Sequence, residues 1–328
     1  MKRKFIIDTD TASDDAVALI MAANHPKIQI EAITVVAGNV SLKQGLQNAM
    51  YTLKLCETTP PPPVYAGISR PLLRKPKTAD HVHGKDGMSD IGLNLSGFVP
   101  EKEHAVQTIL EKINQFQNEV TLVCLAPLTN IAVALLLDKT ITNKVKECII
   151  MGGVGQGRGN VTPLSEYNFW SDPEAAKIVF ESGMPIKMVG WDISREYAVF
   201  DNDDANALRR INTPLANFAV DIQKVLIEYA QEASKLKGFD LPDPIAMAIA
   251  LDETVAIETK EAFVSILTND DDSRGQSVMD YTGASLNKPN ATIVQKVDRK
   301  KFLQMLYSAL SKRSTLPNSN EYSNHSAS

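Results

Sequence analysis

Four carboxylates, Asp8, Asp10, Asp14 and Asp15, fall between a short apolar segment and a helix-like segment near the N-terminus. Helix capping explains one or two of them, because an acidic residue at a helix start is favourable by about 1 kcal/mol. Four carboxylates packed this closely repel one another unless a cation compensates their charge. Since every ligand would be a hard oxygen, the cluster predicts Ca²⁺ or Mg²⁺ rather than zinc.

Further polar segments follow other predicted strands. In an open parallel sheet, ligands bind beyond the carboxyl ends of the strands. The segments at those ends are residues 8–15, 38–39, 125–130, 152–168 and 191–192, which are rich in carboxylates, Asn and Gly. The sequence therefore predicts one polar site along this edge of the sheet.

Three other motifs are less specific on their own. Asp243 lies between two prolines at the start of an Ala/Ile-rich segment, a pattern that taken alone favours a helix N-cap over a metal ligand. The glycine-rich run 152–160 lacks the Gly-Lys-Ser/Thr ending of a phosphate loop, so it predicts a mobile loop over the site. His81 and His83 lie in a glycine-flanked segment, where a surface loop histidine is commoner than a metal pair.

Apolar strand and helix patterns alternate along the chain. Strands are expected over 5–7, 28–36, 120–125, 145–151 and 186–190, and helices over 14–24, 41–57, 128–137 and 173–182. This order predicts an α/β fold, an open and mostly parallel sheet with helices on both faces.

The remainder of the chain completes one domain over residues 1–311. Residues 201–250 are mainly helical in pattern and predict a helical insertion. Strands are expected over 262–267, 277–281 and 291–297, and a last helix over 298–310. The Ser- and Asn-rich tail, 312–328, is expected to be disordered.

Composition excludes several classes of protein. The 328 residues carry a formal net charge of −5 and no basic patch, which argues against nucleic-acid or anionic-membrane partners. Three cysteines without CxxC spacing predict neither a disulfide framework nor a zinc site. No segment approaches the roughly 20 apolar residues of a membrane span, and the first apolar run is too short for a signal peptide. A cytoplasmic protein is expected.

Several segments together resemble one known family. Residues 8–16, DTDTASDDA, are similar to the DxDxxxDDxxA signature of the inosine–uridine preferring nucleoside hydrolases. Similar matches follow in the family's order at 36–39, 83–87, 126–132, 151–153, 159–163, 166–168 and 172–176. The joint match covers about residues 5–250 and implies an open Rossmann-like sheet.

The resemblance also implies a role for each matching position. The carboxylates of Asp10, Asp15 and Asp243 and the backbone carbonyl of Leu125 would bind Ca²⁺, and Asp10 would be the general base on a metal-bound water. Asp8 would lie behind these ligands. The ribose would be held by Asp14, Asn39, Asn160, Glu166 and Asn168. The implied reaction is hydrolysis of the N-glycosidic bond of a ribonucleoside, giving free base and ribose, by a homodimer or homotetramer without a nucleotide cofactor.

One position departs from the family pattern. Members that cleave inosine and uridine usually carry His-Asp-Pro where this chain has Pro242-Asp243-Pro244. That histidine protonates or orients the leaving base, and proline can do neither. The base-side candidates that remain are His81 or His83, Tyr229 or Asp240, or departure with little proton assistance while Trp191 stacks on the base. The preferred nucleobase stays open.

Two other functions are compatible with parts of the sequence. Residues 5–11, FIIDTDT, resemble the hydrophobic-DxDxT motif of haloacid-dehalogenase-type phosphatases, but that function leaves Asn39, Asn160 and the segment 166–168 unexplained. The missing histidine also permits a nucleoside- or ribose-binding protein with impaired catalysis.

Overall fold

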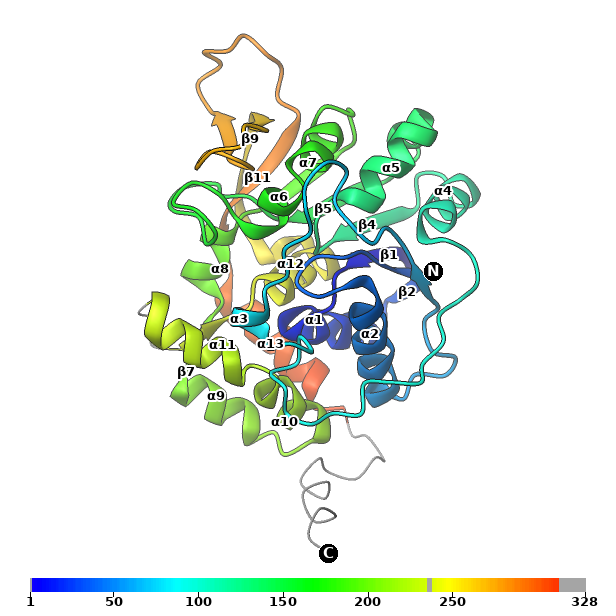
Figure 1. The fold of residues 1–328 in the computed structure, drawn as a ribbon, viewed down its shortest axis with the longest axis vertical. Helices are drawn as coiled ribbons and strands as arrows, with labels where there is room; N and C mark the ends of the chain where they lie inside the picture. The colour runs from blue at the N-terminus through cyan, green and yellow to red at the C-terminus, as the bar shows by residue number, and fades with distance from the viewer. Residues whose placement is uncertain (1, 235–237, 313–328) are drawn as a thin grey trace, which may run out of the picture.

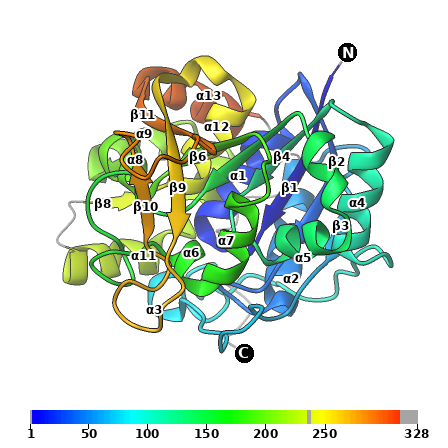
Figure 2. The same cartoon turned by 90° about the horizontal axis from the view of Figure 1, so that it is seen from above.

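A computed structural model describes residues 2–234 and 238–312 of the chain. Among these residues, nine strands form one sheet in the order β10-β9-β11-β6-β5-β4-β1-β2-β3 (Figures 1 and 2). The strands are β1 Arg3–Thr9, β2 Ile28–Val35, β3 Val64–Ala66, β4 Val120–Cys124, β5 Glu147–Met151, β6 Ile186–Val189, β9 Ala256–Ile266, β10 Ser277–Asp280 and β11 Ala291–Val297. The predicted tail 312–328 lies outside the described residues apart from Lys312.

The sheet is mostly parallel, which confirms the predicted α/β class. Strands β3, β2, β1, β4, β5, β6 and β11 are parallel to one another, while β9 pairs antiparallel with both β11 and β10 at the edge. The run from β3 to β6 has the strand order of doubly wound dinucleotide-binding folds. Its topological switch point lies between β1 and β4, and in such folds the ligand site lies at that point.

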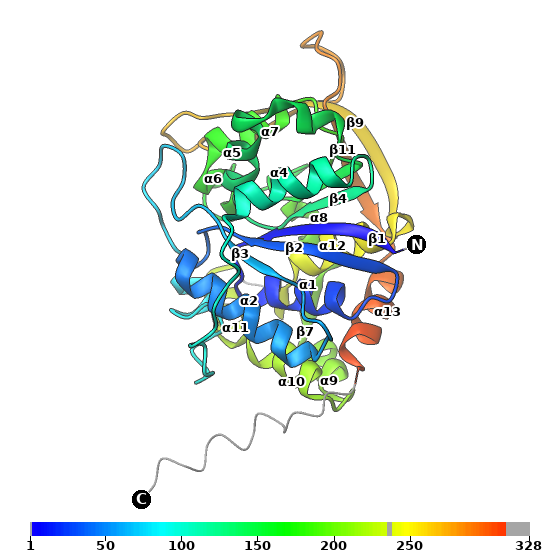
Figure 3. The ribbon, with the colours of Figure 1, turned by 90° about the vertical axis from the view of Figure 1, so that its right-hand side faces the viewer.

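Helices cover both faces of the sheet, as Figure 3 shows. On one face lie α1 Ser13–Ala23, α2 Leu42–Cys56, α12 Pro242–Leu251 and α13 Arg299–Leu310, and on the other lie α4 Ala105–Gln115, α5 Thr129–Leu137 and α7 Pro173–Phe180. Successive side chains of β1 alternate between the two resulting cores. Phe5 and Ile7 pack into the first, and Ile6 packs into the second.

The predicted helical insertion over 201–250 contains a small β-sheet as well as helices, and it ends before α12. Helices α9 Asn202–Arg209, α10 Pro214–Asp221 and α11 Lys224–Tyr229 lie beyond the helices that cover the sheet (Figure 3). A two-stranded antiparallel sheet, β7 Val199–Asp201 with β8 Gly238–Asp240, closes the region at its base. Helix α12 packs directly on α1, and its residues are almost all fully buried, so residues 242–250 belong to the central layers.

Short helices complete the edge at which the parallel strands end. They are α3 Asp80–His83, α6 Tyr167–Ser171 and α8 Trp191–Tyr197. Residues 81–83, expected in a loop, therefore lie in a helical turn. In the part of the chain that the structure describes, no helix has the length and apolar character that crossing a membrane requires.

Candidate active site

The acidic cluster starts where β1 ends and α1 begins. Asp15 caps this helix, because its Oδ2 accepts a hydrogen bond of 2.9 Å from the Ala12 N–H. Its Oδ1 accepts a second hydrogen bond of 2.5 Å from the Thr9 hydroxyl. Capping thus accounts for Asp15, and it does not account for Asp8, Asp10 and Asp14.

Asp243 joins this cluster from the far end of the sequence. It lies in the first turn of α12, and the packing of α12 on α1 places it opposite Asp14 and Asp15. One carboxylate oxygen from each of these three residues lies within 4.8 Å of the other two. Leu241 occupies the N-cap position without a side-chain hydrogen bond, so the capping interpretation of Asp243 is wrong.

Asp10 is fully buried next to these three residues, behind the cavity surface. Its Oδ2 accepts a hydrogen bond of 2.5 Å from the Asn39 N–H, and its Oδ1 has no hydrogen-bond partner. Gly38 makes this contact possible, because a Cβ atom at position 38 would overlap the Asp10 carboxylate. The predicted ligands Asp10 and Asp15 are thus adjacent, but the geometry groups Asp14 with Asp15 and Asp243 more closely.

Asp8 is held behind the cluster by neutral donors. Its Oδ1 accepts hydrogen bonds from the Thr34 hydroxyl at 2.6 Å and from Asn130 Nδ2 at 2.8 Å. Asn130 and Thr34 were not among the predicted site residues, although Asn130 stands in one of the segments that match the family. Both residues are fully buried and fix the end of β1 against β2 and β4.

Burial and mutual repulsion dominate the electrostatics of the cluster. Burial, followed by the charge of neighbouring carboxylates, raises the pKa of Asp10, Asp14 and Asp243 well above the usual value for Asp. Burial also raises the pKa of Asp15 to about 6. Asp10 Oδ1 and Asp14 Oδ1 are buried without partners. A hard divalent cation fits this arrangement, because it would bind the free oxygens and offset the repulsion.

A second polar group lies across from the acidic cluster, around α6. Glu166 caps this helix by accepting hydrogen bonds of 2.7 Å from Asn168 N–H and 3.3 Å from Phe169 N–H, and it also accepts one of 2.7 Å from Gly153 N–H. The Asn168 amide donates to the Leu125 carbonyl at 3.1 Å and to the Met151 carbonyl at 3.2 Å. Burial raises the pKa of Glu166 to about 7. The Leu125 carbonyl, a predicted ligand, is thus positioned by Asn168.

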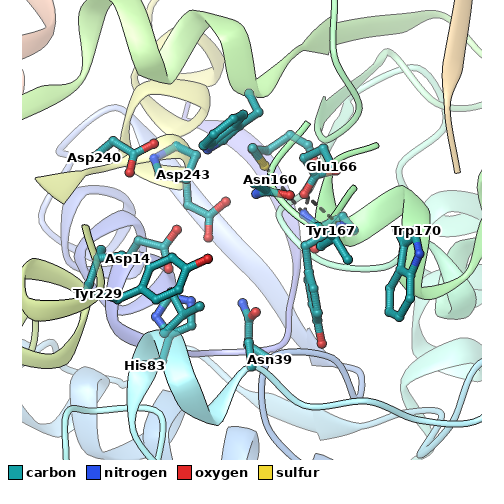
Figure 4. Close-up of a pocket in the computed structure, with 18 of the residues that line it drawn as sticks. Asp14, Asn39, His83, Asn160, Glu166, Tyr167, Trp170, Tyr229, Asp240 and Asp243 are labelled. Atoms are coloured by element: carbon teal, nitrogen blue, oxygen red, sulfur yellow. Dashed lines mark hydrogen bonds between the residues drawn. The ribbon is translucent and has the colours of Figure 1, made fainter. Parts of the chain in front are cut away.

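One cavity of about 420 Å³ opens between these groups (Figure 4). Its lining includes the predicted residues Asp14, Asn39, Leu125, Asn160, Glu166, Asn168 and Asp243, and also the base-side candidates His81, His83, Trp191, Tyr229 and Asp240. Pro242 lines it too, whereas Asp10 and Asp15 lie beneath its surface with no exposure. The structure therefore brings together every site residue that the sequence singled out.

The base-side candidates line the cavity from α3, α8, α11 and β8. His83 is buried, its Nδ1 lies 2.9 Å from the Ser13 hydroxyl, and burial lowers its pKa to about 4. The His81 and Tyr229 rings meet edge to face with centroids 5.4 Å apart. In the described part of the chain, the group of potential metal ligands contains no histidine, which disfavours a His81–His83 metal pair.

Several lining residues were not predicted. Tyr167, Trp170 and Lys77 line the side away from Asp14, and the Arg195 guanidinium stacks on Trp191 at 4.9 Å from the ring centroid. These residues are scattered aromatic and basic residues without a spacing that marks a site in the sequence.

The glycine-rich loop is anchored by a residue whose role the sequence did not reveal. The Asp192 carboxylate accepts hydrogen bonds from Gly155 N–H at 2.6 Å and Gln156 N–H at 3.1 Å. The loop continues to Asn160, which lines the cavity. Asp192 therefore connects the start of α8 to the loop that carries a predicted ribose contact.

Comparison with known proteins gives a consistent result. Residues 5–304 match the model of a family described as inosine-uridine preferring nucleoside hydrolase. The pyrimidine-specific ribonucleoside hydrolase RihA of Salmonella schwarzengrund is 34% identical over 307 residues, covering 93% of this chain and 97% of the relative.

Solved structures agree with the sequence matches. A plant nucleoside hydrolase, the PpNRh1 enzyme, superposes with a TM-score of 0.89 at 30% identity, covering 95% of this chain and 99% of that chain. A purine-preferring ribonucleoside hydrolase from Gardnerella vaginalis superposes with a TM-score of 0.86 at 29% identity, covering 94% and 98%. The similarity thus extends over nearly the whole chain, including the cavity and the acidic cluster.

Proposed function

This chain belongs to the inosine–uridine preferring nucleoside hydrolase family, and from that premise we propose that it hydrolyses the N-glycosidic bond of ribonucleosides with calcium bound at the acidic cluster. The observation that carries the proposal is the convergence of Asp14, Asp15 and Asp243 beneath a cavity lined by Asn39, Glu166 and Asn168. Carboxylates and amides on opposite sides of one cavity suit a polyhydroxylated ring.

The proposed metal ligands are Asp10, Asp15, Asp243 and the Leu125 carbonyl, with Asp14 directed at the ribose. The distances leave Asp14 available to the cation as well, because one of its carboxylate oxygens lies within 4.8 Å of an oxygen of Asp15 and of Asp243. Oxygen-only ligands from flexible carboxylates and one carbonyl favour calcium over magnesium, which demands stricter octahedral geometry. When bound, calcium would lower the pKa of water and hold two vicinal hydroxyls.

Asp10 is the proposed general base. Its Oδ1 is free, while its Oδ2 is fixed by Asn39 N–H, so one oxygen positions the group and the other can accept a proton. Without a cation, burial and the neighbouring carboxylates raise the pKa of Asp10. A bound cation would offset that repulsion and keep the carboxylate ionised, as a general base must be.

The remaining polar residues hold the ribose and stabilise charge. Cleavage of a glycosidic bond passes through an oxocarbenium-like state with positive charge on the sugar. Asp14, Glu166, Asn39 and Asn160 line the cavity where that charge would develop. They would hold the sugar hydroxyls in the ground state, and their electrostatic attraction to the sugar would increase as the bond breaks.

Proton assistance to the leaving base is assigned to the His81–Tyr229 pair. Pro242 faces the cavity and carries no proton, and His83 is buried with a low pKa, so it is neutral near pH 7. The His81 and Tyr229 rings contact each other at the cavity wall and are both hydrogen-bond donors.

The phosphatase alternative requires an accessible nucleophile at Asp8. In the structure Asp8 has no exposure, does not line the cavity, and uses one oxygen to bind Thr34 and Asn130. Such a phosphatase also needs an acidic pair at a strand end, and Asp271-Asp272 is a poor candidate because Asp271 is exposed and hydrogen-bonded to Ser273 in a turn. These observations favour the hydrolase.

One assay separates the three functions. The protein is incubated with calcium and each of inosine, guanosine, adenosine, uridine and cytidine, and released ribose is measured as reducing sugar. Release from at least one nucleoside is expected, with no turnover of p-nitrophenyl phosphate. Nucleoside binding without ribose release would instead support the impaired binding protein, and phosphate release would support the phosphatase.

A further inference from the structure

Asp240 is a cavity-lining carboxylate that neither the proposed metal site nor the ribose contacts use. It lies at the end of β8 and is largely buried, and the cavity lining includes it together with Trp191, Arg195 and Tyr229. Figure 4 shows Asp240 on the same side of the cavity as Tyr229 and Asp243, opposite Tyr167 and Trp170. This side is where the base-side candidates lie.

Asp240 is surrounded by a hydroxyl donor and a positive charge, which favour its ionised form. Its Oδ2 accepts a hydrogen bond of 3.1 Å from the Ser194 hydroxyl. Burial raises the pKa of Asp240, but the positive charge of Arg195 and hydrogen bonds from Ser194 and Trp191 oppose this effect. An ionised carboxylate has only acceptor positions, so it pairs with a donor on a ligand.

We propose that Asp240 recognises the base by accepting a hydrogen bond from a ring N–H on the edge of the base that points away from the ribose. The preferred substrates are then nucleosides whose base carries such an N–H, namely 6-oxopurines and uracil. Adenine and cytosine present a lone pair at the corresponding ring nitrogen, which the carboxylate would repel. This inference rests on the proposed function.

The neighbouring residues support a planar base at this position. The Trp191 ring lines the cavity, and the Arg195 guanidinium stacks on that ring. The Ser194 hydroxyl lies 2.8 Å from the Trp191 carbonyl and 3.1 Å from Asp240 Oδ2, so the residue that carries the stacking ring and the acceptor share one neighbour. A buried acceptor of this kind discriminates strongly, because a substrate without the donor leaves it unpaired.

The test compares kcat/KM for matched nucleosides in the wild type and in Asp240→Asn. The pairs are inosine with adenosine and uridine with cytidine, and 1-methylinosine is the analogue that lacks the ring N–H. The wild type is expected to favour the N–H member of each pair and inosine over 1-methylinosine, each at least about tenfold. Asn can turn its amide N–H₂ toward a ring lone pair, so Asp240→Asn is expected to reduce these preferences about tenfold or more.

Two references separate base recognition from other effects. p-Nitrophenyl β-D-ribofuranoside has the sugar without a base edge, and its kcat/KM should fall less in Asp240→Asn than that of inosine. Asp203→Asn removes an exposed carboxylate of α9 that does not line the cavity, and it should leave the inosine-to-adenosine ratio unchanged.

The results that overturn the proposal are definite. A wild type that favours adenosine and cytidine would contradict it, and so would an Asp240→Asn variant that slows all substrates equally. If no riboside is cleaved, the proposed function fails, and calorimetric binding of inosine and 1-methylinosine then tests Asp240 alone. Equal affinities for the two, or a wild-type preference retained in Asp240→Asn, would remove Asp240 from base recognition.

Discussion

The backbone N–H of Asn39 donates a 2.5 Å hydrogen bond to Oδ2 of Asp10, joining the ends of two adjacent parallel strands. Gly38 allows this approach because it has no Cβ atom to meet the carboxylate. The orientation of Asp10 is therefore set by the segment after β2 as well as by β1. Its second oxygen is buried, unpartnered and beside the other carboxylates.

Asp10→Asn is expected to reduce kcat by about 10²–10⁴-fold, because a general base contributes that much and Asn cannot take up the proton. The fold should persist, since Asn can present its amide oxygen to the Asn39 N–H. Rates on the best nucleoside and thermal unfolding measure the two effects. Asp203→Asn is the control for loss of one negative charge, and a rate within tenfold of the wild type in Asp10→Asn would remove Asp10 as the base.

Removal of calcium is expected to lower activity and stability together. The carboxylates of Asp10, Asp14, Asp15 and Asp243 repel one another when no cation is bound. A ligand that binds only the folded state stabilises it by about 2.7 kcal/mol at 100 times its Kd. EDTA treatment followed by differential scanning calorimetry should show a lower Tm, restored by added calcium more than by magnesium. In Asp243→Asn the calcium-dependent rise in Tm should be much smaller, and a chelated enzyme with full activity would contradict the metal site.

The stability of the calcium-free protein should fall as pH rises from about 5.5 to 8. Burial raises the pKa of Asp8 and of Glu166 to about 7, whereas the unfolded chain loses these protons near pH 4. Between these values the folded state binds more protons than the unfolded state, so the free energy of unfolding decreases with pH.

The measurement is the Tm of the EDTA-treated protein across that pH range. A decrease of several degrees is expected, with a smaller slope in Glu166→Gln, which has no proton to lose. A Tm that increases from pH 5.5 to 8 would show that these carboxyls are ionised in the folded state without a cation.

Pro242→His is expected to increase kcat on inosine by about tenfold or more. Position 242 lines the cavity at the first residue of α12, so a histidine there would add a proton donor with a pKa near neutrality. Pro242→Ala is the matched control, since it removes the ring without adding a donor. The rate of Pro242→His should also gain a dependence on pH between about 6 and 8, and equal rates in the two variants would contradict the assignment.

The central strands and their helices were predictable because their apolar residues recur at the spacings typical of buried strands and of helices. Apolar-rich runs predicted β2, β4 and β5, which are largely buried, and periodic apolar residues predicted α1. Helix α4 was missed although Val106, Ile109 and Ile113 repeat at helical spacing and are buried. The first half of β9 was missed because its side chains are exposed and charged, and only the pairing with β11 makes it a strand.

The site was predictable to the extent that local sequence specifies it. Asp8, Asp10, Asp14 and Asp15 stand together in the sequence, so their clustering needed no tertiary information. Asp243 in isolation looked like a capping residue, and only the packing of α12 on α1 shows otherwise. The contacts of Asn168 with the Leu125 carbonyl and of Asp192 with the glycine-rich loop depend on long-range packing. The oligomeric state and the cytoplasmic location stay predictions.

The cation site joins α1, near the start of the chain, to α12, near its end. A ribosome-bound chain that has released only the first six strands already carries Asp10, Asp14 and Asp15, but it lacks Asp243 and the helix that presents it. Such a chain has the repelling carboxylates without the geometry that binds a metal tightly. At the proposed site, calcium affinity would therefore arise late in biosynthesis, and metal binding would report that the last helices have docked.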